Sequence, residues 1–140
     1  MSARTKARKR ALDVLYAADV RQISINESLA AEAARAVSEA AREASWLYAR
    51  EIVDGIADHG YEIDELIETY SQGWTLGRMP HIDRALLRIG IWEILFNSEV
   101  PDGVAISEAV EAAKQMSTED SSGFINGVLA KIAQSKGVAK

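Results

Sequence analysis

A chain of 140 residues, 48% of them hydrophobic and 26% charged, is long enough for one hydrophobic core but short for two independent domains. It contains no cysteine, which excludes disulfides and thiolate zinc sites, and no apolar run approaches the roughly 18 residues that a membrane-spanning helix needs. The N-terminus lacks the apolar segment of a secretion signal, so we expect a cytoplasmic protein.

The net charge of −5 is unevenly distributed along the chain. Residues 1–10 carry five bases and no acid, whereas residues 11–140 carry 11 bases and 21 acids. A basic arm on an acidic body indicates electrostatic capture of a polyanion, although a solvated, disordered tail gives the same pattern. The five bases of this arm are Arg4, Lys6, Arg8, Lys9 and Arg10.

Helical spacing of apolar residues dominates the chain, and it predicts three helices before residue 60. The first runs from near Thr5 to about Arg21 and carries the basic residues on its first turns. Asn26 is the predicted N-cap of a thin, alanine-rich helix over Glu27–Glu43, which faces solvent. Ser45 is the predicted N-cap of a third helix, which ends near His59-Gly60 with glycine in the left-handed conformation.

Two helices and a turn are predicted next. The spacing of Ile63, Leu66, Ile67 and Tyr70 indicates a short fourth helix. The segment Ser71–Pro80 holds two glycines and a proline, so we expect an ordered turn, pinned to the core by Trp74 and Leu76. A fifth helix, about Ile82–Phe96, is apolar on more than half its circumference. Such a helix is either central to the core, the commoner case, or covered by a partner.

Two further helices complete the prediction. The sixth follows Pro101 and Gly103 and has an apolar spacing of Ile106, Ala109, Val110 and Ala113. The last begins at an N-cap among Asp120, Ser121 and Ser122, buries Ile125, Val128, Leu129 and Ile132, and frays after Gln134. We therefore expect an all-α fold of about seven helices in two small packed bundles, about 1–60 and 61–135, within a single domain over 1–140.

No catalytic constellation is found in the sequence. The chain has two histidines; His81 and Asp83 fall on different faces of a helix, which disfavours a metal site, and His59 suits a helix C-terminus. There is neither a Gly-rich phosphate loop nor a dinucleotide fingerprint, and no histidine lies near the serines of Ser117–Ser122. We therefore expect a protein that is not an enzyme and that needs neither metal nor cofactor.

Two aromatic residues lie close to groups that attract phosphate. Tyr16 follows the basic arm on the first helix, and Phe124 opens the last helix beside backbone amides. Lysine and arginine side chains that neutralise phosphates, combined with aromatic rings that stack on nucleobases, are typical of single-stranded RNA recognition. Taken alone, however, each ring is more commonly a core residue.

Four blocks of the sequence resemble the NusB family of bacterial transcription antitermination factors. The third and fourth blocks are the most specific, and the second has the form typical of actinobacterial members. The blocks are ARKRALDVLYAADV (Ala7–Val20), GWTLGRMPHIDRALLRIGIWEI (Gly73–Ile94), VPDGVAISEAVEAAK (Val100–Lys114) and STEDSSGFINGVLAKI (Ser117–Ile132).

The resemblance implies an all-helical adaptor without catalytic activity. Family members bind the boxA element of ribosomal RNA transcripts with the ribosomal protein NusE, and the pair helps assemble, with RNA polymerase and other Nus factors, an elongation complex that ignores terminators. Some members form homodimers that hide the RNA surface, a question that the sequence leaves open. Carried over by position, the RNA contacts are Arg4, Lys6, Arg8, Lys9, Arg10, Tyr16, Asp120, Ser121 and Phe124, and the NusE-facing residues on the exposed side of the fifth helix are Asp83 and Arg88.

Two other classes remain as alternatives. The RNA-recognition domain of some RNA-cytosine methyltransferases shares this helical fold, but it predicts a catalytic domain after Lys140. A helix-turn-helix regulator could use the turn at Pro101–Gly103. Its second helix, Ile106–Met116, then carries two acidic residues, Glu108 and Glu111, and one basic residue, Lys114. That balance of charge disfavours binding in a DNA major groove.

Overall fold

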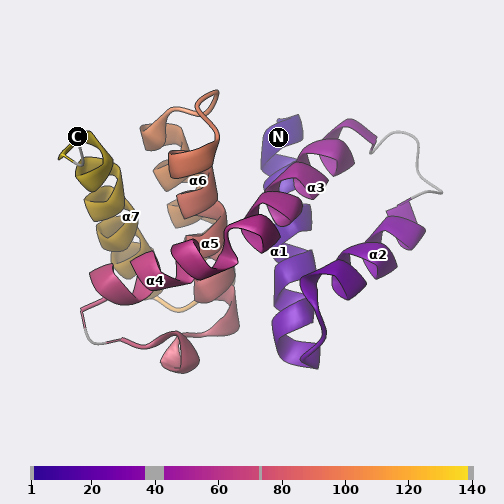
Figure 1. Ribbon diagram of the computed structural model, residues 1–140, viewed down its shortest axis with the longest axis horizontal. Helices are drawn as coiled ribbons and strands as arrows, with labels where there is room; N and C mark the ends of the chain where they lie inside the picture. The colour runs from indigo at the N-terminus through magenta and orange to yellow at the C-terminus, as the bar shows by residue number, and fades with distance from the viewer. Residues whose placement is uncertain (1, 37–42, 73, 139–140) are drawn as a thin grey trace. The chain divides into compact units, whose positions relative to one another are not determined.

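The computed structural model describes residues 2–36, 43–72 and 74–138. Within these ranges the backbone forms seven α-helices and one short 3₁₀ helix, without a β-strand, so the predicted all-α class is confirmed (Figure 1). The chain divides into two compact units, Met1–Asp58 and His59–Lys140, and each is described by itself. That the whole chain acts as one RNA-binding domain stays a prediction.

The first unit is built on α1 (Ala3–Arg21), against which α2 (Ile25–Ala36) and α3 (Glu43–Asp58) pack. Helix α1 begins before the predicted Thr5 because the Ser2 hydroxyl accepts a hydrogen bond from the Thr5 N–H (3.1 Å). It ends at Arg21, as predicted, with Gln22 in the left-handed region. The core between α1 and its neighbours consists of small and branched side chains: Ala7, Ala11, Leu12, Val14, Leu15, Ala18, Leu29, Ala49, Ile52, Val53 and Ile56.

Three predicted helix boundaries in this region are wrong. The N-cap of α2 is Ser24, whose hydroxyl accepts from the Glu27 N–H (3.0 Å), so the helix starts before Asn26. Ser45 lies inside the first turn of α3 and is buried. Gly60 is the first residue of α4, which starts directly after His59, instead of a left-handed end to α3. The predicted helix over Glu27–Glu43 is described as far as Ala36, and residues 37–42 lie outside the described residues.

A buried serine fixes α2 to α1. The Ser28 hydroxyl donates a hydrogen bond to the carbonyl oxygen of Val14 at 2.7 Å, and Ser28 is buried. A short polar bond of this kind holds the alanine-rich α2 in place where its side chains offer little packing volume.

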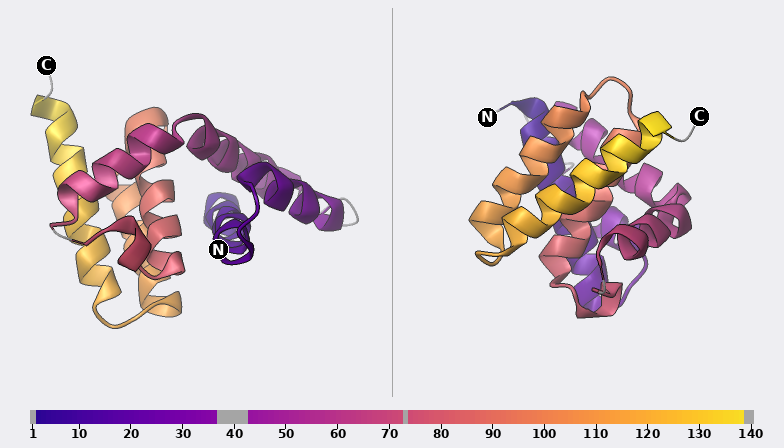
Figure 2. Two further views of the ribbon diagram at one scale, coloured as in Figure 1. Left: turned by 60° about the horizontal axis from the view of Figure 1, so that its bottom comes forward. Right: turned by 90° about the vertical axis from the view of Figure 1, so that its left-hand side faces the viewer.

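The second unit is organised around α5 (His81–Phe96), which packs against α4 (Gly60–Tyr70), α6 (Asp102–Met116) and α7 (Ser121–Val138). Side chains on almost all sides of α5 are buried, so its excess of apolar residues belongs to the core: Ala85, Leu86, Leu87, Ile89, Ile91, Trp92 and Ile94. Helices α6 and α7 lie side by side and antiparallel (Figure 2).

Close approach of α5 and α7 depends on Gly90. A Cβ atom at this position would lie 2.7 Å from Cδ1 of Leu129, a fully buried side chain of α7. The predicted inward face of α7, which includes Leu129, is confirmed, since Ile125, Val128 and Ile132 are also buried. On α6 the predicted Ala109 and Ala113 are buried together with Ala105, whereas the predicted Ile106 and Val110 are only half-buried.

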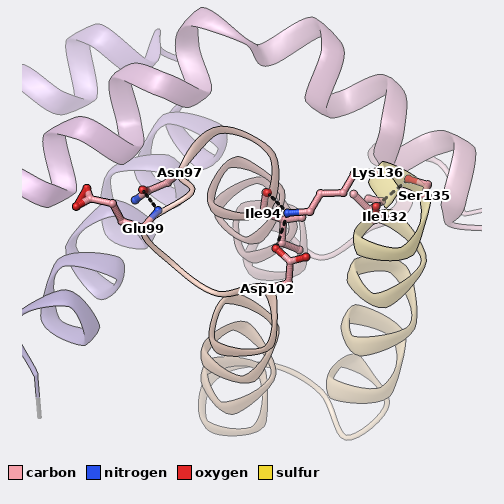
Figure 3. Close-up of polar contacts among 7 residues, drawn as sticks. All are labelled: Ile94, Asn97, Glu99, Asp102, Ile132, Ser135 and Lys136. Carbon is pink, nitrogen blue, oxygen red and sulfur yellow. Dashed lines mark hydrogen bonds and ion pairs between the residues drawn. The ribbon is translucent and has the colours of Figure 1, made fainter. Parts of the chain in front are cut away.

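The end of α7 is anchored, and the predicted fraying after Gln134 is wrong for the described residues. The Lys136 Nζ donates to the carbonyl oxygen of Ile94 near the end of α5 (2.8 Å) and to Oδ1 of Asp102 at the start of α6 (2.7 Å), as Figure 3 shows. A cation near the C-terminus of α5 also interacts favourably with the dipole of that helix. One side chain thus ties three helices together.

Candidate nucleic-acid interface

The basic arm is an ordered helix. Residues 3–10 form the first two turns of α1, which Ser2 caps. On these turns Lys6 and Lys9 are exposed, and Tyr16 lies further along on the same side, at a spacing that helical geometry brings onto one face. Tyr16 is 41% exposed, so its ring is accessible from solvent. The face also contains one acid, Asp13, which is exposed between Lys9 and Tyr16.

Two of the three arginines of the arm contact α3 of their own unit. Arg4 is exposed, and its guanidinium lies 5.2 Å from the centre of the Tyr48 ring. Arg10 donates from Nε to the Ser45 hydroxyl (3.1 Å), and its guanidinium lies 5.9 Å from the centre of the Trp46 ring. These contacts hold the start of α1 against α3.

Arg8 is the basic residue of the arm whose burial departs most from the predicted exposed position. It is 9% exposed, because it lies on the side of α1 that also buries Ala7 and Ala11. Of the five basic residues of the arm, Arg4, Lys6 and Lys9 are exposed, Arg10 is half-buried and Arg8 is buried, and their binding to phosphate stays a prediction. The two lysines are free of any ion pair given for the described residues.

A second group of predicted residues lies at the start of α7, in the other unit. Asp120 is exposed, and its carbonyl oxygen accepts a hydrogen bond from the Phe124 N–H (3.2 Å). Phe124 is half-buried on the first turn. Ser121 is buried, and its hydroxyl donates to Oδ2 of Asp83 (2.7 Å), so this side chain faces the protein instead of the surface.

Asp83 lies at the centre of this turn. It belongs to the first turn of α5, is 4% exposed, and accepts hydrogen bonds from the hydroxyls of Ser117 and Ser121. The Ser121 hydroxyl also lies within hydrogen-bond distance of the Thr118 hydroxyl (2.8 Å). The prediction that Asp83 lies on the exposed side of its helix is therefore wrong: its carboxylate is used to hold the turn between α6 and α7.

Arg88 is likewise engaged within its own unit. Its guanidinium donates to both carboxylate oxygens of Asp64 on α4, from Nε at 2.8 Å and from Nη2 at 3.0 Å. This bidentate geometry makes Arg88 a link between α4 and α5. Neither residue predicted to face the partner is an uncommitted surface group.

The environment of Trp74 differs from the prediction. It was expected to pin the turn to the core, but its side chain is 54% exposed and lies beside Phe124, with ring centres 6.3 Å apart and planes tilted by 54°. Among the described residues of this segment, Ser71 and Met79 are buried instead. The signal that was present in the sequence is a large ring placed among turn-forming residues, where little apolar surface is available to cover it.

The described residues offer no assembled metal site. No group of three or more His, Asp or Glu side chains among them could hold a metal ion. His81 Nδ1 lies 2.7 Å from a guanidinium nitrogen of Arg84, and His59 stacks on Phe96 with ring centres 3.9 Å apart. Nor is any helix in the described part of the chain long and apolar enough to cross a membrane.

Comparison with known proteins gives a consistent result along the whole chain. A model of the NusB family matches residues 5–134. The chain is 74% identical over 136 residues to the transcription antitermination protein NusB of the actinobacterium Leifsonia xyli subsp. xyli, covering 97% of this chain and 94% of the relative.

Two solved structures have a similar fold. One is T. maritima NusB, with a TM-score of 0.82 at 31% identity, covering 94% of this chain and 90% of that chain. The other is a chain in a complex of the antitermination factors NusB and NusE with double-stranded RNA. It has a TM-score of 0.82 at 29% identity and covers 96% of this chain and 98% of that chain.

Proposed function

This chain belongs to the NusB family of transcription antitermination proteins, and we propose that it works as a non-catalytic adaptor. It binds single-stranded boxA-type RNA in ribosomal RNA transcripts together with the ribosomal protein NusE. The bound pair then joins the elongating RNA polymerase and the other Nus factors in the cytoplasm. The solved complex of the antitermination factors NusB and NusE with double-stranded RNA supports NusE and RNA as partners, whereas the choice of a single strand rests on the exposed ring of Tyr16 on the same face as Lys6 and Lys9.

The observation that carries the RNA-binding proposal is the exposed face of α1. Lys6 and Lys9 extend from an ordered helix with Tyr16 on the same side, so two charges and one ring are presented in a fixed arrangement. The lysines supply attraction to phosphate that does not depend on sequence, whereas the ring stacks an unpaired base. Because Arg8 is buried and Arg10 contacts Ser45 and Trp46 on α3, we assign both to holding α1 in place.

The turn before α7 makes the second proposed contact with RNA. Its acids, Glu119 and Asp120, are exposed. They oppose phosphate, so we propose that this region contacts bases and limits non-specific binding. We propose that NusE binds at the start of α5. Asp83 and Arg88 support this region indirectly, through their hydrogen bonds to Ser121 and Asp64 within the unit.

The proposal is tested by fluorescence anisotropy with a labelled boxA-type RNA, a scrambled RNA and a duplex RNA over a series of salt concentrations. Binding should favour the boxA-type single strand and weaken as salt rises. The double substitution Lys6→Gln and Lys9→Gln should reduce the slope of log affinity against log salt by about 0.7 for each lost phosphate contact.

The matched control is Lys131→Gln, which removes an exposed positive charge from the middle of α7. It should leave the slope within error of the unmodified chain. Equal affinity for boxA-type and scrambled RNA, or equal effects of the α1 and α7 substitutions, would reduce the activity to non-specific attraction and contradict the proposal.

A further inference from the structure

Trp74, which is exposed, and Phe124, which is half-buried, form an aromatic pair whose indole the proposed function has not yet used. Trp74 lies between α4 and the 3₁₀ helix at Leu76–Arg78, whereas Phe124 lies on the first turn of α7. More than half of the Trp74 side chain faces solvent. A single exposed ring is common on protein surfaces, but an exposed ring next to a second ring forms a continuous apolar surface of the kind that binding sites use.

Both rings are attached to backbone that is held in place. The buried Ser71 donates from its hydroxyl to the Trp74 carbonyl oxygen (2.5 Å), and the Trp74 N–H donates back to the Ser71 carbonyl oxygen (3.4 Å). At the start of α7, buried Ser121 is fixed to Asp83. The pair is therefore presented on anchored backbone, which lowers the entropy lost when a ligand binds.

The geometry of the rings limits how a ligand can use them. Their centres are 6.3 Å apart and their planes are tilted by 54°. A base inserted between two parallel rings needs about 7 Å, which is two stacking separations of about 3.4 Å. The pair is too close and too tilted for insertion, so a planar ligand has to stack on the solvent-exposed part of the indole, with Phe124 as the neighbouring ring.

The charges around the pair select the kind of ligand. Glu119 and Asp120 are exposed just before α7, which disfavours a phosphate close to Phe124. Arg78 is exposed four residues after Trp74, at the end of the 3₁₀ helix, and offers a cation in the same segment as the indole. An uncharged planar group whose attached phosphate extends toward Arg78 fits this distribution, and that is the chemistry of a nucleotide within a single strand.

We propose that Trp74, supported by Phe124, is a base-stacking site for one unpaired nucleotide of the bound RNA. This site deepens the proposed RNA-binding function and rests on it. An aromatic platform accepts every base, so it adds affinity for unstacked RNA, and it discriminates against duplex RNA, in which no base is available to stack.

The test compares Trp74→Ala, Trp74→Phe and the unmodified chain in anisotropy titrations of boxA-type RNA with NusE present. Trp74→Ala should weaken binding about 5- to 150-fold, the equivalent of roughly 1–3 kcal/mol for one stacked base, while Trp74→Phe retains most of the affinity. Tyr61→Ala is the matched control. Tyr61 is an 83% exposed ring on the first turn of α4, and its removal should change nothing.

A second readout identifies the stacked nucleotide. In a series of RNAs that each lack one base, a single position should abolish the difference between Trp74→Ala and the unmodified chain, because the two partners of one contact are then removed together. RNA should also quench tryptophan fluorescence of the unmodified chain, and most of that quenching should disappear in Trp74→Phe.

The outcomes separate this site from the function on which it rests. If the unmodified chain binds boxA-type RNA and Trp74→Ala binds it equally well, the stacking site is wrong and the function stands. If Trp74→Ala instead weakens NusE binding without RNA present, the surface belongs to the protein partner. If the unmodified chain binds no RNA, the proposed function fails and this site fails with it. Unchanged thermal unfolding of Trp74→Ala shows that a loss of affinity is local.

Discussion

Replacing Asp83 by alanine should destabilise the protein through the turn between α6 and α7. The substitution removes a carboxylate that is 4% exposed and that accepts hydrogen bonds from two hydroxyls, on Ser117 and Ser121. Hydrogen bonds to a charged group contribute about 1.5–3 kcal/mol each. A carboxylate in the first turn of α5 adds about 0.3–1 kcal/mol through the helix dipole.

Two effects reduce this sum. Removing the carboxylate also removes the free-energy penalty of burying a charge, which amounts to several kcal/mol before its partners are counted. In addition, the Ser121 hydroxyl keeps possible partners in Ser117 (3.0 Å) and Thr118 (2.8 Å). We therefore expect a net loss of about 2–3 kcal/mol in the free energy of unfolding for Asp83→Ala, and about half of that for Asp83→Asn, which keeps one acceptor.

Urea unfolding followed by circular dichroism measures this loss as a lower midpoint with an unchanged slope. A double-mutant cycle with Ser121→Ala should give an interaction energy of at least about 1 kcal/mol, since the two groups are in contact. Glu111→Ala is the control, because this exposed acid has only a distant ion pair with Lys114 (4.0 Å) and should change stability by less than about 0.5 kcal/mol. A loss for Asp83→Ala no larger than that of the control would refute the assignment of Asp83 as the anchor of the turn.

Three further substitutions test other parts of the structure. Gly90→Ala should destabilise the second unit by about 1–3 kcal/mol in urea unfolding, because its methyl group collides with a buried leucine of α7. Gly127→Ala, with open space around it, should instead be neutral or stabilise by up to about 1 kcal/mol, and the reverse order would contradict the packing described. Lys136→Met should lower the free energy of unfolding by about 0.5–1.5 kcal/mol, since it removes the contacts of Lys136 to α5 and α6. Lys131→Met is the control at an exposed position of α7. Equal effects of the two substitutions would show that the contacts of Lys136 contribute nothing to stability. Asp120→Asn should tighten RNA binding about two- to fivefold in anisotropy titrations by removing repulsion, and unchanged or weaker binding would place the RNA elsewhere.

The parts of the fold that follow from local pattern were predictable from the sequence. The buried face of α7 follows from helical spacing alone, and the apolar circumference of α5 correctly placed that helix in the core. Helix boundaries were less certain because several residues near each end could act as caps. Ser24 was used in place of Asn26, and Ser45 became part of the helix that it was expected to precede.

The candidate site was harder to predict because its side chains are held by residues far away in the sequence. Charge pattern identified the basic arm, but it gave no indication that Arg10 would meet Ser45 and Trp46 on another helix. In the same way, Asp83 contacts residues 34 and 38 positions later, and these contacts bury it. The prediction for Trp74 was wrong for another reason: an apolar ring is buried on average, and no local pattern in the sequence indicates that this one stays 54% exposed.

The central claim, that the chain joins RNA and NusE as an adaptor, is tested most directly by measuring the coupling between the two partners. Isothermal titration gives the affinity for boxA-type RNA with and without NusE, and the affinity for NusE with and without RNA. We predict that each partner tightens the binding of the other at least about tenfold. The two factors should be equal, because thermodynamic linkage requires it. Affinities for RNA and for NusE that are each unchanged by the other partner would contradict the adaptor role.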